Sequence, residues 1–358
     1  MIDFAVIGGG IAGISAAARL SELGHVVVFE QENALAYHAS GRSAALFEES
    51  YGKPSVVALN KASRDYHMQA HGGVLSPRGL MLVGRKADAE TFAQDVATMG
   101  LDPLTVDEAA ARVPILNRAV VDRAAWHDAA WDIDTDRLIQ NFASEVRANG
   151  GRIVMRAGVS AIRRIDGGWM LSTASGDFEA RHIVNAAGAW VDEVARMAGV
   201  GPLGFSPLRR SMGRIPAPGG HDVQAWPMMF GPGESWYAKP DAGALIVSPA
   251  EETPVAPHDA FADDMVLAEG FDRYEQFVTE PVTRLLTSWA GLRTFAPDRQ
   301  LVLGPDPREP AFIWCAGQGG YGFQTAPAAS ALLADLVAGR APVLDKDHVA
   351  ALRPERLV

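Results

Sequence analysis

The sequence predicts an α/β protein in which a Rossmann-like, dinucleotide-binding domain is joined to a second domain built on a mixed sheet. Three observations predict this fold class. The chain opens as strand, glycine turn, helix and strand, all within residues 2–29. A second glycine-rich turn, at 317–322, again precedes a helix. Residues 205–300 are rich in Pro, Trp and short alternating runs such as Ala244–Ser248, which is typical of strands in a mixed sheet.

The first elements follow from the pattern of apolar residues. Ile2–Ile7 is a short apolar run, Ile11–Leu23 an Ala-rich helix, and Val26–Phe29 a β-branched run typical of a buried parallel strand. Residues 31–50 lack periodicity, and we expect a long loop there. Loops of that length inside a compact domain are usually functional. Lys53–Ala70 then reads as a helix.

The middle and last thirds of the chain alternate between strands and helices. We expect short strands and turns over residues 76–134, with an acidic helix near Asp107–Arg112, and then a helix over Asp134–Asn149, capped by Asp134 or Thr135. The turn Asp166-Gly167-Gly168 predicts a hairpin. The remaining predicted elements are the strands Arg152–Met155, Ala161–Ile165, Trp169–Thr173, Phe178–Val184 and Phe312–Ala316, and the helix Thr325–Ala338.

The order of these elements divides the chain into two domains. We expect residues 1–75, 135–204 and 300–358 to form the dinucleotide-binding domain. Residues 76–134 and 205–299 should form the substrate-binding domain.

Composition excludes several classes of function. The 358 residues are 48% hydrophobic and 21% charged, as in ordinary soluble enzymes. A net charge of −11 argues against a nucleic-acid partner, because phosphate binding needs clustered Lys and Arg. No stretch reaches the ~18 uncharged apolar residues of a membrane span, and Asp3 stands where a signal peptide needs basic residues. The single cysteine, Cys315, fits a reducing cytosol. We therefore expect a cytoplasmic protein without an integral membrane segment or a metal site.

The first glycine turn, GGGIAG, fits the motif GxGxxG in the strand–turn–helix context that the motif requires. Gly8 permits the tight turn, Gly10 lets the backbone approach a diphosphate, and Gly13 lets the helix pack on the sheet. Free N–H groups at the helix start favour the diphosphate. Glu30, at the end of the next strand, is placed to accept ribose hydroxyls and disfavours a 2′-phosphate. The alternative is a packing turn with Glu30 as a solvated strand end.

Two further features favour FAD over NAD. Gly41-Arg42-Ser43 lies in the long loop after Glu30, where NAD enzymes usually have no such element. The second glycine turn, GQGGYGFQT at Gly317–Thr325, opens a helix. A helix N-terminus there can face the negative charge that develops on a flavin during reduction.

An ordered series of motifs carries a family resemblance. The stretches are VIGGGIAG, YHASGRSAA, SYGKPSV, LSPRG, DIDTD, VNAAGAW, PLRRS, WPM, ESWYAKPDAG, WAGLRTF and GQGGYGFQT. With them the chain resembles the D-amino-acid oxidase and dehydrogenase superfamily, and most closely the bacterial D-arginine dehydrogenase type. The series runs from residue 6 to residue 325 and is more specific for the flavoprotein family than for the substrate.

The resemblance implies a set of residues around a non-covalent FAD. Residues 41–46 would wrap the flavin and the diphosphate, Val159 would touch the adenine through its backbone, and Ala187-Gly188 would close over the diphosphate. Cys315 is expected to pack in the core, and His38 to line the cofactor cleft without a covalent link. The complete predicted cofactor set is Gly8, Gly10, Ile11, Ala12, Gly13, Glu30, Gln31, Ser40, Gly41, Arg42, Ser43, Ala44, Ala45, Leu46, Val159, Ala187, Gly188, Gly320, Tyr321, Gly322, Phe323 and Gln324.

The resemblance also implies the residues that hold the substrate. Arg210 and Arg293 match the family's carboxylate-binding positions, where a planar guanidinium binds carboxylate in a bidentate way. Tyr51 and Tyr237 match its active-site tyrosines, and Gly320 completes the predicted catalytic set. The alternatives are surface ion pairs for the arginines and core packing for Tyr237. Hydride transfer needs a neutral amine, and no side chain stands out in the sequence as the base.

Two departures from the related enzymes bear on specificity. Leu80 stands where D-arginine dehydrogenases have a Glu for the substrate guanidinium, and Leu46 replaces an expected His. Both changes predict an apolar pocket, in which an unpaired guanidinium would cost several kcal/mol. Glu48 or Glu49 could take over the role of the missing acid, but we expect both to lie on a solvated loop face.

The sequence therefore predicts an oxidoreductase that uses FAD to oxidise the CH–NH₂ group of a D-amino acid with an apolar or small side chain. Hydride transfer to flavin N5 would give an imine, and then a 2-oxo acid and ammonia. The alternatives are a secondary amine (sarcosine- or opine-like) or a 2-hydroxy acid as substrate, and a flavin-binding module without activity. Oxygen and a quinone both stay open as the electron acceptor.

Overall fold

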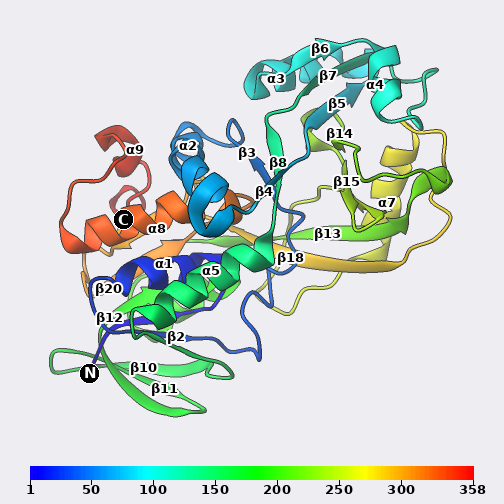
Figure 1. Ribbon diagram of the computed structural model, residues 1–358. Helices are drawn as coiled ribbons and strands as arrows, with labels where there is room; N and C mark the ends of the chain where they lie inside the picture. The colour runs from blue at the N-terminus through cyan, green and yellow to red at the C-terminus, as the bar shows by residue number, and fades with distance from the viewer.

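The computed structural model describes residues 1–358 and arranges them around three sheets (Figure 1). The strands are β1 Ile2–Ile7, β2 Val26–Phe29, β3 Leu46–Glu48, β4 Leu75–Pro77, β5 Leu80–Gly84, β6 Asp102–Leu104, β7 Arg123–His127, β8 Ala130–Ile133, β9 Arg152–Val154, β10 Val159–Ile165, β11 Gly168–Thr173, β12 Gly176–Asn185, β13 Ser206–Pro216, β14 Met228–Phe230, β15 Tyr237–Asp241, β16 Ala244–Ser248, β17 Thr253–Pro254, β18 Thr287–Phe295, β19 Val302–Pro305 and β20 Phe312–Ala316. The helices are α1 Ile11–Leu20, α2 Pro54–Gln69, α3 Ala89–Met99, α4 Val106–Arg112, α5 Thr135–Ala148, α6 Val191–Met197, α7 Asp264–Glu275, α8 Gly322–Ala338 and α9 Lys346–Ala350.

The first sheet has a parallel centre that brings the glycine turn to its edge. Its order is β10-β11-β12-β1-β2-β9, with β20 beside β12 and β19 beside β20. Strand β1 runs parallel to both neighbours, and Ile7 pairs with Phe29 on one side and with Asn185 on the other. The turn that follows Ile7 therefore lies at the carboxyl ends of three adjacent strands, which is the edge where open parallel sheets bind ligands.

Successive side chains of a strand point to opposite faces of the sheet, so alternate residues of this sheet pack in two separate hydrophobic cores. Val6 and Val28 pack with α1, α2, α5 and α8, which lie together on one face (Figure 1). Ile7 and Phe29 face the other way and pack with Trp169, α6 and β20. Both faces are covered at the centre, where β2 and the segment Phe4–Ile7 of β1 are apolar and almost fully buried, as expected of a parallel sheet.

The second sheet is mixed, as the sequence predicts. Its order is β17-β13-β16-β15-β14-β5-β7-β6, with β18 beside β13. Strand β5 runs parallel to β14 and antiparallel to β7. The long strands β13 and β18 pair from Ser206 and Phe295 to Arg214 and Thr287, and they extend from the first sheet toward the far end of the molecule (Figure 1).

A small third sheet, β3-β8-β4, lies between the two large ones. All strands of the first large sheet fall within the segments 1–75, 135–204 and 300–358, and all strands of the second within 76–134 and 205–299. The third sheet pairs β3 with β8, which come from different segments. The exact domain boundaries therefore stay a prediction.

Several sequence-based boundaries are wrong. Helix α1 ends at Leu20 rather than at Leu23, and α8 begins at Gly322 rather than at Thr325. The loop expected over residues 31–50 contains β3, because the edge of β8 offers it partners and Phe47 is completely buried. Helices α3 and α7 were not expected. None of the helices combines the length and the apolar character that crossing a bilayer requires.

Candidate functional site

The first glycine turn forms the cradle that its motif predicts. Gly8 has a φ of +106°, and a Cβ there would lie 2.5 Å from the Ala186 carbonyl oxygen. A Cβ at Gly13 would lie 1.9 Å from the Gly8 oxygen, so only glycine lets α1 approach the sheet this closely. The first turn of α1 has no side-chain cap from Gly10. Its N–H groups, apart from that of Ile11, are thus open to an anion.

Glu30 and Ser40 complete this end of the cleft. Glu30 is 7% exposed, and its carboxylate oxygens accept hydrogen bonds from Gly9 N at 2.7 Å and Glu32 N at 2.9 Å. The alternative of a solvated strand end is therefore wrong. Ser40 Oγ accepts from Ile11 N at 3.0 Å, which fastens the following loop to the helix N-terminus.

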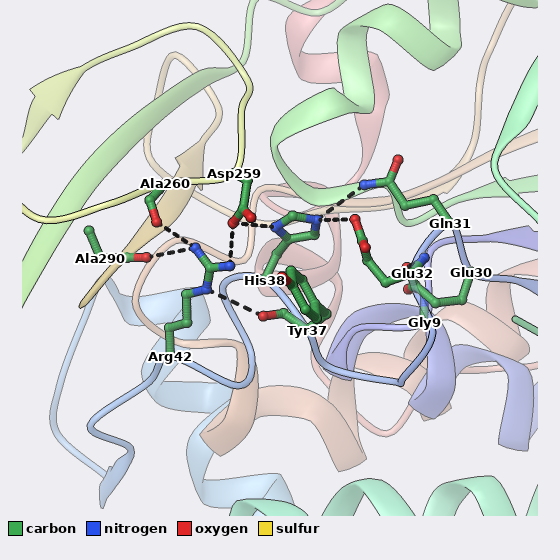
Figure 2. A network of polar contacts seen from close by, with 10 residues as sticks. All are labelled: Gly9, Glu30, Gln31, Glu32, Tyr37, His38, Arg42, Asp259, Ala260 and Ala290. Carbon is green, nitrogen blue, oxygen red and sulfur yellow. Dashed lines mark hydrogen bonds and ion pairs between the residues drawn. The ribbon is translucent and has the colours of Figure 1, made fainter. Parts of the chain in front are cut away.

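The loop of residues 31–42 is tied to residues far along the chain, Asp259, Ala260 and Ala290 (Figure 2). Arg42 donates to the carbonyl oxygens of Ala260 at 2.7 Å and Ala290 at 3.1 Å, and pairs with Asp259. His38 Nε2 lies 3.0 Å from Glu32 Oε1, and the imidazole lies against Trp190. The Arg42 guanidinium is thus satisfied by the protein itself, so this residue anchors the loop rather than offering a free charge to a ligand.

Two cavities along the carboxyl edge of the sheet share the residues of this turn and loop. The first holds the predicted residues Gly8, Gly10, Glu30, Gln31, Ser40, Arg42, Val159, Ala187 and Gly188, together with His38. The second holds Gly10, Ile11, Ala12, Ser40, Arg42, Ser43, Ala45, Leu46, Gly188, Gly320, Gly322, Phe323 and Gln324. Four predicted cofactor residues line neither cavity, namely Gly13, Gly41, Ala44 and Tyr321. The two glycines face neighbouring backbone, Ala44 lines a different cavity, and Tyr321 packs on Tyr51.

These two cavities fit an FAD. They share the lining residues Gly10, Ser40 and Gly188; the first includes the acidic strand end at Glu30, and the second includes the start of α1 and the turn before α8. Thr294 Oγ1 and Gln318 Nε2 are buried without a hydrogen-bond partner, and both residues line the second cavity. Buried polar groups in this state call for a ligand that pairs with them. Cys315 also borders this space, but its Sγ contacts the Ala12 oxygen within the core.

A third cavity adjoins the second and brings all the predicted catalytic residues together. It has about 720 Å³ of free space, the open mouth included. Ser43, Ala45 and Leu46 line both this cavity and the second one. The predicted catalytic residues in its wall are Tyr51, Arg210, Tyr237, Arg293 and Gly320.

Arg210 and Arg293 make one end of this cavity positive. They lie on the paired strands β13 and β18. Arg210 is 3% exposed, its Nε and Nη1 have no partner, and only Nη2 contacts Glu252, at 3.4 Å. Burial, followed by repulsion from Arg293, lowers the Arg210 pKa; arginine nevertheless remains charged at neutral pH. Two adjacent guanidiniums with open donors are suited to a carboxylate, and the surface ion-pair alternative is wrong for Arg210.

The two tyrosines differ in their hydrogen bonding. The Tyr51 hydroxyl donates to Glu234 Oε2 at 3.0 Å, and burial, followed by the charge of Glu234, raises the Tyr51 pKa. Tyr237 is 4% exposed, and its hydroxyl has no partner. Tyr237 belongs to a buried cluster with Leu80 and Phe230 and also lines the cavity, so the expected alternative of core packing holds in part. The Tyr237 hydroxyl is therefore the one left free for a ligand.

The rest of the wall combines apolar side chains with the polar residues Ser43, Glu48, Glu234 and Gln324. Leu46 and Leu80 line it as the sequence predicts, next to Met99, Met228 and Phe230, which were not predicted as site residues. The WPM motif was the available signal for Met228, whereas Met99 comes from the unpredicted helix α3.

The expectation of a solvated Glu48 is wrong, because the residue is 4% exposed and lines this cavity. Glu49 instead pairs with Arg64 outside it. Glu234, which was also not predicted, lines the cavity beside Tyr51. No group of three or more His, Cys, Asp or Glu side chains is placed to hold a metal ion.

Comparisons with known proteins identify the family and agree with the fold. The sequence model of the DAO family, described as FAD dependent oxidoreductase, matches residues 3–336. The chain is similar to glycine oxidase of Pseudomonas aeruginosa, with 25% identity over 95% of this chain and 96% of that protein. Among solved structures it resembles L-proline dehydrogenase from P. horikoshii, with a TM-score of 0.84, 21% identity and coverage of 99% and 97% of the two chains. It also resembles glycine oxidase from Geobacillus kaustophilus, with a TM-score of 0.82, 22% identity and 97% coverage of both chains.

Proposed function

Because this chain belongs to the DAO family of FAD-dependent oxidoreductases and is similar to glycine oxidase, we propose that it oxidises the CH–NH₂ group of a D-amino acid. The products would be an imine and, after hydrolysis, a 2-oxo acid and ammonia. The proposal extends to a non-covalent FAD and to a preference for apolar or small side chains over basic ones.

The pair Arg210 and Arg293 is the observation that carries this proposal. Both residues line the cavity that adjoins the proposed flavin space, and Arg210 has two buried donors without partners. A substrate α-carboxylate would satisfy those donors and fix the position of the α-carbon. The Tyr237 hydroxyl, also without a partner, would bond the carboxylate or the amine.

The bound FAD would supply the acceptor for the hydride of the α-carbon. The residues of this chain would bind and orient the substrate. The two guanidiniums hold the carboxylate, and Leu46, Leu80 and Phe230 line the space beside it and exclude water from their part of the wall. Gly320 lies against the Arg293 guanidinium, where a Cβ would come within 3.1 Å of Nη1. Glycine at this position therefore leaves Arg293 in place.

A second candidate substrate is a secondary amine. The solved L-proline dehydrogenase that shares this fold is named for a secondary amine. A cyclic or N-substituted amino acid keeps the α-carboxylate, so Arg210 and Arg293 would serve it equally well.

A dye-reduction assay over matched D- and L-amino acids, sarcosine, D- and L-proline and 2-hydroxy acids tests the proposal. We expect reduction of the dye with D-amino acids, little with their L-enantiomers, and stoichiometric release of ammonia. Turnover confined to sarcosine or proline, without ammonia, would favour the second candidate. Activity on 2-hydroxy acids alone would contradict both.

A further inference from the structure

A buried lysine of the second sheet holds the loop between the two proposed binding sites. Lys239 lies on β15 and is 8% exposed. Its Nζ donates to the carbonyl oxygens of Ala44 at 2.6 Å and Ala45 at 2.8 Å, and it lies 2.9 Å from Asp132 Oδ1. Burial lowers the pKa of Lys239, but the Asp132 carboxylate opposes this shift. The three acceptors match the three N–H donors of an ammonium, so Lys239 has no lone pair with which to act as a base.

The two carbonyl groups that Lys239 holds belong to a wall that two cavities share. Ala45 lines both the second cavity, which fits the flavin, and the substrate cavity, whereas Ala44 lines the substrate cavity. Residues 43–45 belong to no helix or strand, so no strand or helix ladder fixes their backbone. Ala45 N donates to Ser43 Oγ at 3.1 Å within the same stretch. The hydrogen bonds from Lys239 therefore tie this stretch to β15.

The carboxylate that faces Lys239 is itself held in place by a second cation. Asp132 lies on β8 and pairs in register with Leu46 on β3. Its Oδ2 accepts from Arg78 Nε at 2.8 Å, and Arg78 also donates to the carbonyl oxygen of Trp226 at 2.8 Å. The ammonium of Lys239 thus lies between a fixed carboxylate and the backbone of the shared wall.

Strand geometry places this lysine next to the substrate cavity without exposing it to a ligand. Side chains two residues apart on a strand point to the same face, so Lys239 lies beside Tyr237, which lines the cavity. Lys239 itself lines none of the three cavities. It can therefore act on a bound substrate or cofactor only through Ala44 and Ala45.

We infer that Lys239 is a positioning residue, which fixes the wall shared by the flavin and substrate cavities through the carbonyl groups of Ala44 and Ala45. This inference rests on the proposed function. A fixed wall keeps a bound substrate in one position relative to the cofactor, and a misplacement of about 1 Å can cost roughly a hundredfold in rate. Arg210 and Arg293 still bind the carboxylate without Lys239, so its loss should affect the chemical step more than substrate affinity.

The test compares Lys239→Met with the matched control Arg214→Met. Lys239→Met removes all three donors and nearly keeps the length of the side chain. Arg214 also holds one carboxylate and two carbonyl groups, because it donates to Asp241 Oδ2 at 2.8 Å and to the carbonyl oxygens of Asp241 and Ala242 at 3.2 Å. None of these three residues lines any of the three cavities.

Anaerobic stopped-flow reduction is measured with FAD in excess and with the D-amino acid that reduces the wild-type flavin fastest. In Lys239→Met we expect the limiting rate of flavin reduction to fall about tenfold or more, while the apparent dissociation constant of the substrate changes by less than about threefold. The dissociation constant of FAD, measured by titrating the apoprotein and following flavin fluorescence without substrate, should rise about tenfold. Arg214→Met should keep all three values.

A milder variant, Lys239→Gln, carries the test if Lys239→Met does not take up flavin. Glutamine is one atom shorter, carries two donors in place of three and has no charge, so the limiting rate should fall about fivefold. A wild-type limiting rate in either flavin-loaded variant, or an equal loss in Arg214→Met, would overturn this inference and leave the proposed function intact. If no D-amino acid reduces the wild-type flavin, the proposed function fails, and an unchanged FAD dissociation constant in the Lys239 variants would overturn this inference separately.

Discussion

The nucleotide end of the cleft and the substrate cavity differ in how their polar groups are satisfied. At the nucleotide end, Glu30, Ser40 and Arg42 all have partners within the protein. In the substrate cavity, Arg210 and Tyr237 carry buried donors without partners. In the first region, side-chain hydrogen bonds within the protein hold the backbone turn in place. In the second region, buried donors have no partner in the protein, and we expect a substrate to supply their acceptors.

This difference predicts that substitutions at the nucleotide end change flavin content, and that substitutions in the cavity change kinetics at constant flavin content. The largest effect is expected for Gly13→Val, because even a Cβ at this position would lie 1.9 Å from the Gly8 oxygen. We expect the loss of most bound flavin, measured from the ratio of flavin to protein absorbance. Gly201→Ala is the control, since its Cβ would meet only the flexible end of Arg308. Full flavin content in the Gly13 variant would contradict the claim that the nucleotide end of the cleft controls flavin binding.

The next largest effect is expected for Arg210→Met and Arg293→Met. Each variant removes a charge-assisted contact worth about 1.5–3 kcal/mol, so kcat/KM should fall roughly ten- to a hundredfold with an unchanged flavin spectrum. Arg42→Met is the contrast, because its guanidinium bonds Ala260 and Ala290, and it should weaken FAD binding instead. An arginine variant with near wild-type kcat/KM would show that the residue is not a carboxylate anchor.

Leu80→Glu should change specificity rather than overall rate. The new acid would add a negative charge to the cavity wall and give a guanidinium a partner, so kcat/KM for D-Arg should rise relative to D-Leu or D-Met. Desolvation of the guanidinium limits the gain to a few kcal/mol. Both proteins are compared at one pH. If the wild-type enzyme already prefers D-Arg, then Glu48 serves the guanidinium by itself.

The smallest effect is expected for Tyr237→Phe. It removes a single neutral hydroxyl that has no protein partner, and one hydrogen bond contributes about 0.5–1.5 kcal/mol. We expect kcat/KM to fall by a factor of a few, with no loss of thermal stability. A destabilised protein with unchanged kinetics would assign Tyr237 to packing.

The same contrast explains what could be predicted from the sequence. The phosphate turn depends on Gly8 and Gly13 within a few residues of one strand, so local pattern was sufficient to predict it. The burial of Glu48 depends on His127 and on pairing of β3 with β8, which join distant parts of the chain. Helix α3 was missed although Phe92, Val96 and Met99 recur at helical spacing and pack against a buried cluster; the stripe is short, and none of its residues is fully buried. Long-range strand pairing leaves little trace in local periodicity.

The central claim is that this protein oxidises an amino acid bound by Arg210 beside a non-covalent FAD. The most direct measurement is to mix the purified protein anaerobically with single D-amino acids and follow its visible absorbance, and then to precipitate it with acid. We expect a yellow protein that is bleached by D-amino acids, is bleached far more slowly as Arg210→Met, and releases its pigment into the supernatant. A protein that is colourless and fails to take up added FAD, or one that stays yellow with every amino acid, would contradict this account.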